Sequence, residues 1–191
     1  MPNWCLNRLD IYSEDPAEMK LIYDSITDDK GQFTFATLVP MPEVLEGTTS
    51  GGYVDVGMAI LDDDDEFLTN LMTRWRWLEE REGVTTVEAV EAYFREKTKA
   101  VKEAKASRAA AEETGFSNWY DWRIANWGCK WDASTGDDTV AFDEGDEEIS
   151  VAYQTPWGPP EAFIEALRET FPSASITAFY DEPGMQFAGY L

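Results

Sequence analysis

The stretch WCLNRLDIY, residues 4–12, followed by DPAEMKLIYDSI, residues 15–26, decides the fold. In the first part, Cys5, Leu9 and Ile11 alternate onto one face, which predicts a half-buried strand, although Asn7 falls on the same face. In the second part, an aspartate, a proline and a glutamate precede apolar residues at helical spacing, which predicts a helix from about residue 16 to 27. A strand that runs directly into an amphipathic helix predicts a sheet with helices packed on it.

The C-terminal part repeats this alternation of strand and helix patterns. Residues 140–142 and 149–153 alternate apolar and polar residues around a turn at 144–146, which predicts a hairpin. Prolines bracket a predicted helix at 159–171, and residues 176–189 predict a second hairpin. The predicted class is α+β, a ferredoxin-like antiparallel sheet with helices on one face and a central α-helical insertion.

The central part, residues 45–115, is predicted to be mostly helical. It follows a short predicted strand at 33–35 and a long predicted loop at 38–52, which contains two prolines and three glycines. The acidic run at 62–66 lacks the spacing of an EF-hand loop and precedes apolar residues at helical spacing. It therefore predicts the start of a helix rather than a calcium site.

A second helix of this central part is predicted to begin at the capping box Thr85-Thr86-Val87-Glu88, after Gly83 ends the first, and to reach Glu113. Beyond Val101 only alanines continue its apolar stripe, so we expect slight burial and a helix that projects from the body or lies lightly on it.

The charge is strongly negative and unevenly distributed. The 191-residue chain has a formal net charge of -23 and no histidine. Residues 1–73 contain 3 basic and 15 acidic side chains, residues 74–130 contain 11 and 10, and residues 131–191 contain 1 and 13. Two acidic ends around a balanced middle predict one domain, 1–191, with a core of 1–44 and 116–191 interrupted by an insertion at 45–115.

This composition excludes several classes of function. The negative field repels nucleic acid, acidic membranes and further copies of the chain, so we expect no direct nucleic-acid or membrane contact and a monomer or small homo-oligomer. The absence of histidine removes the commonest general base and metal ligand, and no phosphate-binding glycine loop is present. We expect no enzymatic activity, catalytic residue, metal or cofactor.

The cysteines and the hydropathy pattern indicate the compartment. Cys5 and Cys129 are predicted to be free, buried thiols, because nothing in the sequence indicates an exported chain in which a disulfide would persist. No apolar stretch is long enough for a membrane span. We therefore expect a cytoplasmic protein; with the origin that the resemblance described next implies, this is the cytoplasm of the bacterial host.

Four separated motifs carry a resemblance to a known family. They are Met1-Pro2-Asn3-Trp4-Cys5, Asn126-Trp127-Gly128-Cys129-Lys130-Trp131-Asp132-Ala133, Thr155-Pro156-Trp157-Gly158-Pro159-Pro160, and Tyr180-Asp181-Glu182-Pro183-Gly184 with Phe187-Ala188-Gly189. Together they resemble the YubB ferredoxin-like domain family, with the helical stretch at about 45–115 as a variable insertion.

The resemblance implies a ferredoxin-like α+β fold without an iron–sulfur cluster, encoded by plasmids and bacteriophages, with no established activity and no catalytic residues. Cys129 departs from the family pattern, in which threonine is expected, so the resemblance implies no special role for its thiol.

The tryptophan-rich segment is the first candidate site. Four tryptophans occupy thirteen positions, from Trp119 to Trp131, and the candidate aromatic patch comprises Trp127, Lys130, Trp131, Asp132 and Trp157. Stacking and charge could bind a ligand there. The structural interpretation, which we favour, has Trp127 and Trp131 filling the space between sheet and insertion, Lys130 and Asp132 paired at the rim, and Gly128 in a tight turn.

The acidic surface is the second candidate site. Its predicted partner-binding residues are Asp62, Asp63, Asp64, Asp65, Glu66, Asp137, Asp138, Asp143, Glu144, Asp146 and Glu147. A surface of this charge imitates the phosphates of a duplex and would be drawn to the basic groove of a nucleic-acid-binding protein. Together with the plasmid and phage origin that the resemblance implies, this charge predicts a DNA mimic from a mobile element that inhibits a host defence enzyme, of the anti-CRISPR or anti-restriction type.

Two other classes of function remain open. In one, the chain is a structural or protein-interaction module that uses its aromatic patch and helical insertion, and the acidity serves only solubility. In the other, a small-molecule enzyme is built around Trp127, Lys130, Trp131 and Asp132. A pocket with a converging lysine would favour the enzyme, and a filled core would exclude it.

Overall fold

The computed structural model describes residues 3–136 and 138–191, which form two compact units. The sheet unit comprises Met1–Met41 and Trp122–Leu191, and the helical unit comprises Pro42–Asp121. The sheet unit has 6 basic and 20 acidic residues in its sequence, and the helical unit has 9 and 18. Both units are therefore acidic.

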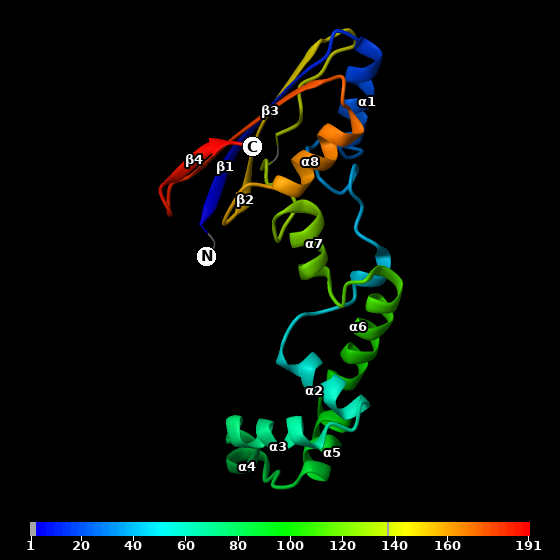
Figure 1. The fold of residues 1–191 in the computed structure, drawn as a ribbon, viewed down its shortest axis with the longest axis vertical. Coiled ribbons are helices and arrows are strands. Elements are labelled where there is room, and N and C mark those ends of the chain that lie inside the picture. The colour runs from blue at the N-terminus through cyan, green and yellow to red at the C-terminus, as the bar shows by residue number, and fades with distance from the viewer. Residues whose placement is uncertain (1–2, 137) are drawn as a thin grey trace. The chain divides into compact units, whose positions relative to one another are not determined.

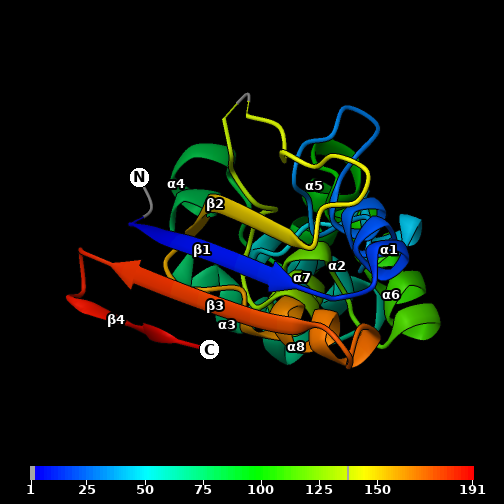
Figure 2. The same ribbon diagram turned by 90° about the horizontal axis from the view of Figure 1, so that it is seen from above.

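The sheet unit is an α+β fold built on a four-stranded antiparallel sheet (Figure 2). The strands are β1 (Trp4–Tyr12), β2 (Glu148–Pro156), β3 (Ser175–Glu182) and β4 (Phe187–Tyr190), in the order β2-β1-β3-β4. Because β2 and β3 each pair antiparallel to β1, they run parallel to each other with β1 between them. This is a split βαβ unit of the kind found in ferredoxin-like folds.

Two helices cover one face of the sheet, α1 (Pro16–Ile26) and α8 (Glu161–Thr170), as Figures 1 and 2 show. The predicted cap of α1 is confirmed, because the Asp15 carboxylate accepts a hydrogen bond of 2.9 Å from the Ala17 amide. The helices bury an apolar stripe against alternate residues of the strands. The buried side chains of this core include Leu9, Ile11, Met19, Ile22, Ile26, Ile149, Val151, Phe163, Ile164, Leu167 and Ala178.

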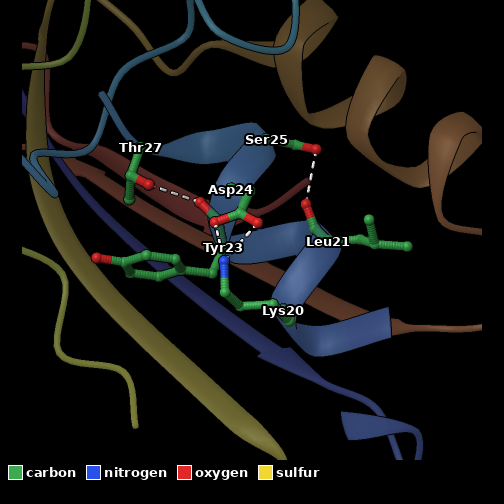
Figure 3. A network of polar contacts seen from close by, with 6 residues as sticks. All are labelled: Lys20, Leu21, Tyr23, Asp24, Ser25 and Thr27. Carbon is green, nitrogen blue, oxygen red and sulfur yellow. Dashed lines mark hydrogen bonds and ion pairs between the residues drawn. The ribbon is translucent and has the colours of Figure 1, made fainter. Parts of the chain in front are cut away.

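Polar contacts along α1 show how the helix ends (Figure 3). The hydroxyls of Ser25 and Thr27 each donate a hydrogen bond of 2.7 Å to the carbonyl four residues earlier. Lys20 and Asp24 form an ion pair on the outer side, as i,i+4 neighbours do. The Thr27 hydroxyl thus satisfies a carbonyl of the last turn, and the helix ends at Ile26, within one residue of the predicted end.

The helical unit contains η1 (Glu43–Leu45), α2 (Gly52–Leu61), α3 (Asp65–Arg74), α4 (Trp77–Glu82), α5 (Val87–Lys97) and α6 (Ala100–Thr114). The chain then continues through α7 (Trp119–Trp127) into the sheet unit. The predicted helix start at the acidic run is confirmed, because Asp64 caps α3 by accepting from the Phe67 amide at 2.9 Å. Gly83 ends α4 in a left-handed conformation, also as predicted.

Two predictions for this region are wrong, and one helix was missed. The single helix predicted over 85–113 is two helices, because Thr98 closes α5 by donating to the Phe94 carbonyl at 2.8 Å and accepts from the Ala100 amide at 3.1 Å. The helix predicted to reach Gly83 breaks between α3 and α4. Its predecessor α2 was not anticipated, although it begins at Gly52, the last residue of the predicted loop.

The expectation that α6 is lightly buried is also wrong. Its alanine face, including Ala100, Ala104 and Ala110, is fully buried. A Cβ atom on Gly57 of α2 would lie only 2.2 Å from the Ala100 carbonyl oxygen and 2.8 Å from the Ala104 methyl group. The small side chains therefore bring the two helix backbones into direct contact, which compensates for the missing large apolar residues.

In the sheet unit, the hairpin predicted at 140–153 does not form. Residues 140–142 make no strand, and β2 instead pairs along its length with β1. The preceding segment packs beside α1, where the Val140 amide donates to the Gly31 carbonyl at 2.8 Å and Phe142 stacks on Tyr23 at 4.8 Å between ring centroids. The short strand predicted at 33–35 is reduced to one bridge between Thr27 and Phe33.

We expect Gly57→Ala to destabilise the helical unit by about 1–3 kcal/mol, because the added methyl group overlaps backbone that cannot move aside alone. Chemical denaturation followed by circular dichroism measures the change. Gly47→Ala is the matched control, since a Cβ atom there meets nothing within 4 Å. An unchanged or higher stability of Gly57→Ala would show that the two helices are not held in direct backbone contact.

Candidate partner-binding surfaces

Trp127 belongs to the core of the sheet unit. Its side chain is 2% exposed, and its indole Nε1–H donates to the Val39 carbonyl at 2.9 Å. The ring packs edge-on against Phe35 and Trp122, and the Arg123 guanidinium lies 4.8 Å from its centroid. Trp127 is therefore a core residue and unavailable to a ligand, as expected, but its contacts lie within the sheet unit rather than between the sheet and the insertion.

Trp131 instead belongs to a cluster at the surface, which we name the tryptophan cluster: Trp4, Lys130, Trp131 and Trp157. The Trp131 ring centroid lies 6.2 Å from that of Trp4 and 5.9 Å from that of Trp157. The Lys130 ammonium lies 5.0 Å from the Trp131 centroid and 5.7 Å from the Trp157 centroid, within cation–π range of both. Trp157 is 47% exposed, so the cluster presents aromatic surface to a partner.

Backbone and buried side chains hold this cluster in place. Trp157 has a positive φ of 66°, an uncommon conformation for a residue with a side chain, and its amide donates to the Asn3 carbonyl at 2.8 Å. The Thr155 hydroxyl donates to the Gly158 carbonyl at 2.7 Å and accepts from the Asn7 amide group at 2.8 Å. This buried network explains why Asn7 lies on the inner face of β1.

The Asp132 carboxylate makes hydrogen bonds within the sheet unit, and its predicted pairing with Lys130 stays a prediction. The carboxylate accepts from the Thr34 hydroxyl at 2.6 Å and from the Phe35 amide at 2.7 Å. It thus joins the segment after α1 to the segment after α7. Trp127, Trp131 and Asp132 therefore lie in three different environments.

The tight turn predicted at Gly128 is confirmed. Gly128 has a φ of 85°, and a Cβ atom there would lie 2.7 Å from the Glu161 amide nitrogen. Only glycine allows the chain to pass so close to the start of α8. This turn separates the buried Trp127 from the surface residues Lys130 and Trp131.

The acidic residues form two exposed sets, one in each unit. Asp62 to Glu66 lie between α2 and the first turn of α3, where Asp62 accepts a hydrogen bond of 2.7 Å from Arg108 and Asp64 caps the helix. Asp138, Asp143, Glu144, Asp146 and Glu147 lie exposed in the segment that leads into β2. Asp137 lies outside the described residues. A single surface that joins both sets stays a prediction.

The buried thiols and phenol are poor candidates for catalysis. Cys5 and Cys129 are free and buried, as predicted. Burial raises the pKa of Cys5 to about 11, with Glu182 acting in the same direction, and burial raises the pKa of Cys129 to about 12, with Asp132 adding to it. Burial also raises the pKa of Tyr153. These groups stay protonated near neutral pH and are weak nucleophiles.

Residues 3–136 and 138–191 show neither a cluster of metal ligands nor a helix suited to a membrane. No three cysteine, aspartate or glutamate side chains of this part come together in a way that could hold a metal ion. No helix in it combines the length and apolar character needed to cross a membrane.

One exposed surface was missed by the sequence interpretation. Trp4 and Leu6 alternate with the buried residues of β1 and point to the opposite face of the sheet, where they are 38% and 44% exposed. Phe179 and Tyr190 are also exposed, at 38% and 72%. The alternation in residues 4–12 contained the signal, since its outward positions include large apolar residues where a solvated face would be polar.

The sheet with its covering helices defines the class, an α+β ferredoxin-like domain. Residues 127–191, the last third of the chain, match the family model described as the ferredoxin-like domain in Api92-like protein. Among solved structures, the chain is similar to the protein Api92 from Yersinia pseudotuberculosis, with 11% sequence identity, a TM-score of 0.43, and coverage of 100% of this chain and 93% of that chain. No curated protein matches the chain.

We expect both thiols to resist a thiol-specific reagent in the folded protein and to react rapidly in denaturant. At about pH 8 the raised pKa values lower the thiolate fraction by about 100-fold for Cys5 and about 1000-fold for Cys129 relative to an ordinary cysteine, and burial limits access further. Absorbance of the released chromophore measures the rate. A fast reaction of the folded protein would show an activated, accessible cysteine.

We expect Asp132→Ala to lower the free energy of unfolding by about 1–3 kcal/mol, because it leaves the Thr34 hydroxyl and the Phe35 amide without their acceptor. Asp138→Ala, at an exposed position of the following segment, is the control. Thermal and chemical denaturation measure both variants. A stable Asp132→Ala protein would return Asp132 to the list of candidate ligand-binding residues.

Proposed function

We propose that the chain is a non-enzymatic, acidic binding protein of a mobile genetic element that inhibits a nucleic-acid-binding defence enzyme of a bacterial host by DNA mimicry. It acts in the host cytoplasm and belongs to the anti-CRISPR or anti-restriction type. The observation that carries the proposal is the exposure of the described acidic residues in both sets, on a chain with a net charge of -23.

The acidic segment before β2 supports the proposal best. Between 143 and 148, five of six residues are acidic, and all five are exposed. The sequence from 131 to 191 contains one basic residue, Arg168, and its guanidinium is engaged internally by the Ile176 and Leu191 carbonyls at 3.1 and 2.9 Å. This part of the surface therefore presents negative charge with little local compensation, as a phosphate backbone does.

A basic groove that binds DNA is the natural target of such a field. Long-range attraction raises the rate of encounter and weakens steeply with salt, by the same physics that steers DNA into the groove. The inhibitor and the nucleic acid then compete for one site. Mimicry thus requires mutually exclusive binding and a strong dependence of affinity on salt.

The second candidate function is a protein-interaction module. The exposed tryptophan cluster favours it, because Trp4 and Trp157 offer aromatic surface of the kind enriched in protein interfaces. In that case the acidity keeps the protein soluble, and partner binding depends only weakly on salt.

Competition with duplex DNA tests the proposal. A purified restriction endonuclease and a purified RNA-guided nuclease complex are each incubated with labelled duplex DNA and increasing amounts of the chain. We expect the chain to displace DNA from at least one of them, with log affinity falling linearly in log salt between about 50 and 500 mM. Phage plating efficiency in cells that carry the same enzyme provides the second readout.

Three charge variants make the test specific, and each removes four carboxylates. The first variant changes the acidic set before β2: Asp143→Asn, Glu144→Gln, Asp146→Asn and Glu147→Gln. The second variant changes the acidic set before α3: Asp62→Asn, Asp63→Asn, Asp65→Asn and Glu66→Gln. Asp64 is kept in the second variant because it caps α3. The control changes exposed residues of the charge-balanced middle, as Glu79→Gln, Glu82→Gln, Glu112→Gln and Glu113→Gln.

We expect at least one acidic-set variant to lose displacement by about tenfold or more while the control keeps it. Equal losses in all three variants would mean that only net charge matters. A partner that stays bound at high salt and to every variant would contradict mimicry and favour the interaction module.

A further inference from the structure

The face of the sheet that α1 and α8 leave uncovered carries large apolar side chains beside polar ones. In a solvated antiparallel sheet, outward positions alternate with the core and are mostly hydrophilic. Here large apolar side chains occupy outward positions on three strands, and all are exposed. We name them the open-face strip: Trp4, Leu6, Phe179 and Tyr190.

The strand register places these residues together. Leu6 of β1 pairs with Asp181 of β3, so Phe179 lies two positions along the same face, opposite Arg8. Phe179 pairs in turn with Tyr190 of β4, and their rings meet edge-on at 5.3 Å between centroids. The strip therefore crosses β1, β3 and β4, which lie side by side in Figure 2.

The strip continues into the tryptophan cluster. Trp4 lies two residues from Leu6 on the same face of β1, and its ring is 6.2 Å from Trp131. Exposed apolar side chains thus occur from the end of the sheet to β4, with the charged residues Arg8 and Asp181 beside Leu6 and Phe179. Exposed apolar side chains gathered in this way mark an interaction site, because they are costly to leave in water.

The charges around the strip indicate what covers it. Arg8, an outward residue of β1, pairs with Asp10 at 2.9 Å, and Asp10 also accepts from the Ser150 hydroxyl at 2.6 Å. Glu148 and Asp181 occupy outward positions on the neighbouring strands. With 6 basic and 20 acidic residues in the sheet unit, a second copy of the chain is repelled and a basic surface is attracted.

We propose that the open-face strip docks an amphipathic, basic α-helix of a partner protein. The apolar side of the helix packs on Leu6, Phe179 and Tyr190, and its lysine or arginine side chains reach the surrounding carboxylates. We infer a helix because helices pack on the faces of sheets and bury apolar side chains there. A bound strand would instead pair with the backbone at the edge of the sheet. The inference rests on the proposed function only in taking the partner to be a basic protein.

Three synthetic helical peptides of about 18 residues, long enough for five turns, serve as probes. The first places leucine on one side and lysine on the other. The second has the same composition in an order that spreads leucine around the helix. The third replaces every lysine of the first with glutamate. Calorimetry at low and high salt measures affinity, and the indole and methyl resonances of the chain locate the contact.

The variant Leu6→Ser with Tyr190→Ser removes apolar surface from the strip. Its matched control, Leu21→Ser with Ile124→Ser, removes two similarly exposed side chains, at 60% and 41%, from α1 and α7 of the same unit. All four side chains are exposed, so the folded state is retained and circular dichroism verifies it.

We expect the amphipathic basic peptide to bind most tightly, to shift the Trp4 indole and Leu6 methyl resonances, and to lose about tenfold in affinity with the strip variant but not with the control. Equal binding of the rearranged peptide, or no effect of the strip variant, would overturn the proposal, since general attraction of a polycation would then explain the binding. If the glutamate peptide binds as tightly as the lysine peptide, the proposal that the partner is basic is overturned.

Self-association is the remaining alternative. A dimer in sedimentation experiments that becomes monomeric with Leu6→Ser and Tyr190→Ser would overturn the proposal and assign the strip to a second copy. If the peptide fails to dock while the chain still displaces DNA, only this inference falls. If the peptide docks but no defence enzyme releases DNA, the proposed function falls and the docking surface stands.

Discussion

The rest of the sheet unit depends on the pairing of β1 with strands on both sides. β1 pairs with β2 from Trp4 to Tyr12 and with β3 from Leu6 to Tyr12, although both partners lie more than 130 residues further along the chain. Its inward residues form the core under α1 and α8, and its outward residues begin the open-face strip. A shift of one residue in this register would exchange the two faces.

Much of this unit could be predicted from local sequence patterns. The bounds of β1, the cap of α1, the last hairpin and the helix before Phe171 follow from alternation, capping residues and prolines. The failures involve contacts between distant residues. Residues 140–142 alternate as a strand would, but Gly31 and Tyr23 hold them beside α1, and the alanine face of α6 is buried only because Gly57 admits it.

For the candidate sites, too, local features could be predicted and contacts between distant residues could not. Sequence predicted that Trp127 is structural and that Gly128 makes a turn, yet it could not show that the turn sends Trp131 to the surface beside Trp4 and Trp157. The sequence identified the acidic residues, but it could not show that their side chains are exposed. In the proposed mechanism, charge and aromatic surface have separate roles. The acidic sets attract a basic partner from a distance, and the open-face strip supplies contact area once the partner has arrived.

Sedimentation of a mixture of defence enzyme, duplex DNA and the chain tests the central claim most directly. Mimicry predicts two exclusive complexes, enzyme with DNA or enzyme with the chain, whose proportions follow the concentrations and shift toward free components as salt rises. A ternary complex that holds all three at saturating concentrations would contradict the claim, because the acidic surface would then lie outside the groove that holds DNA.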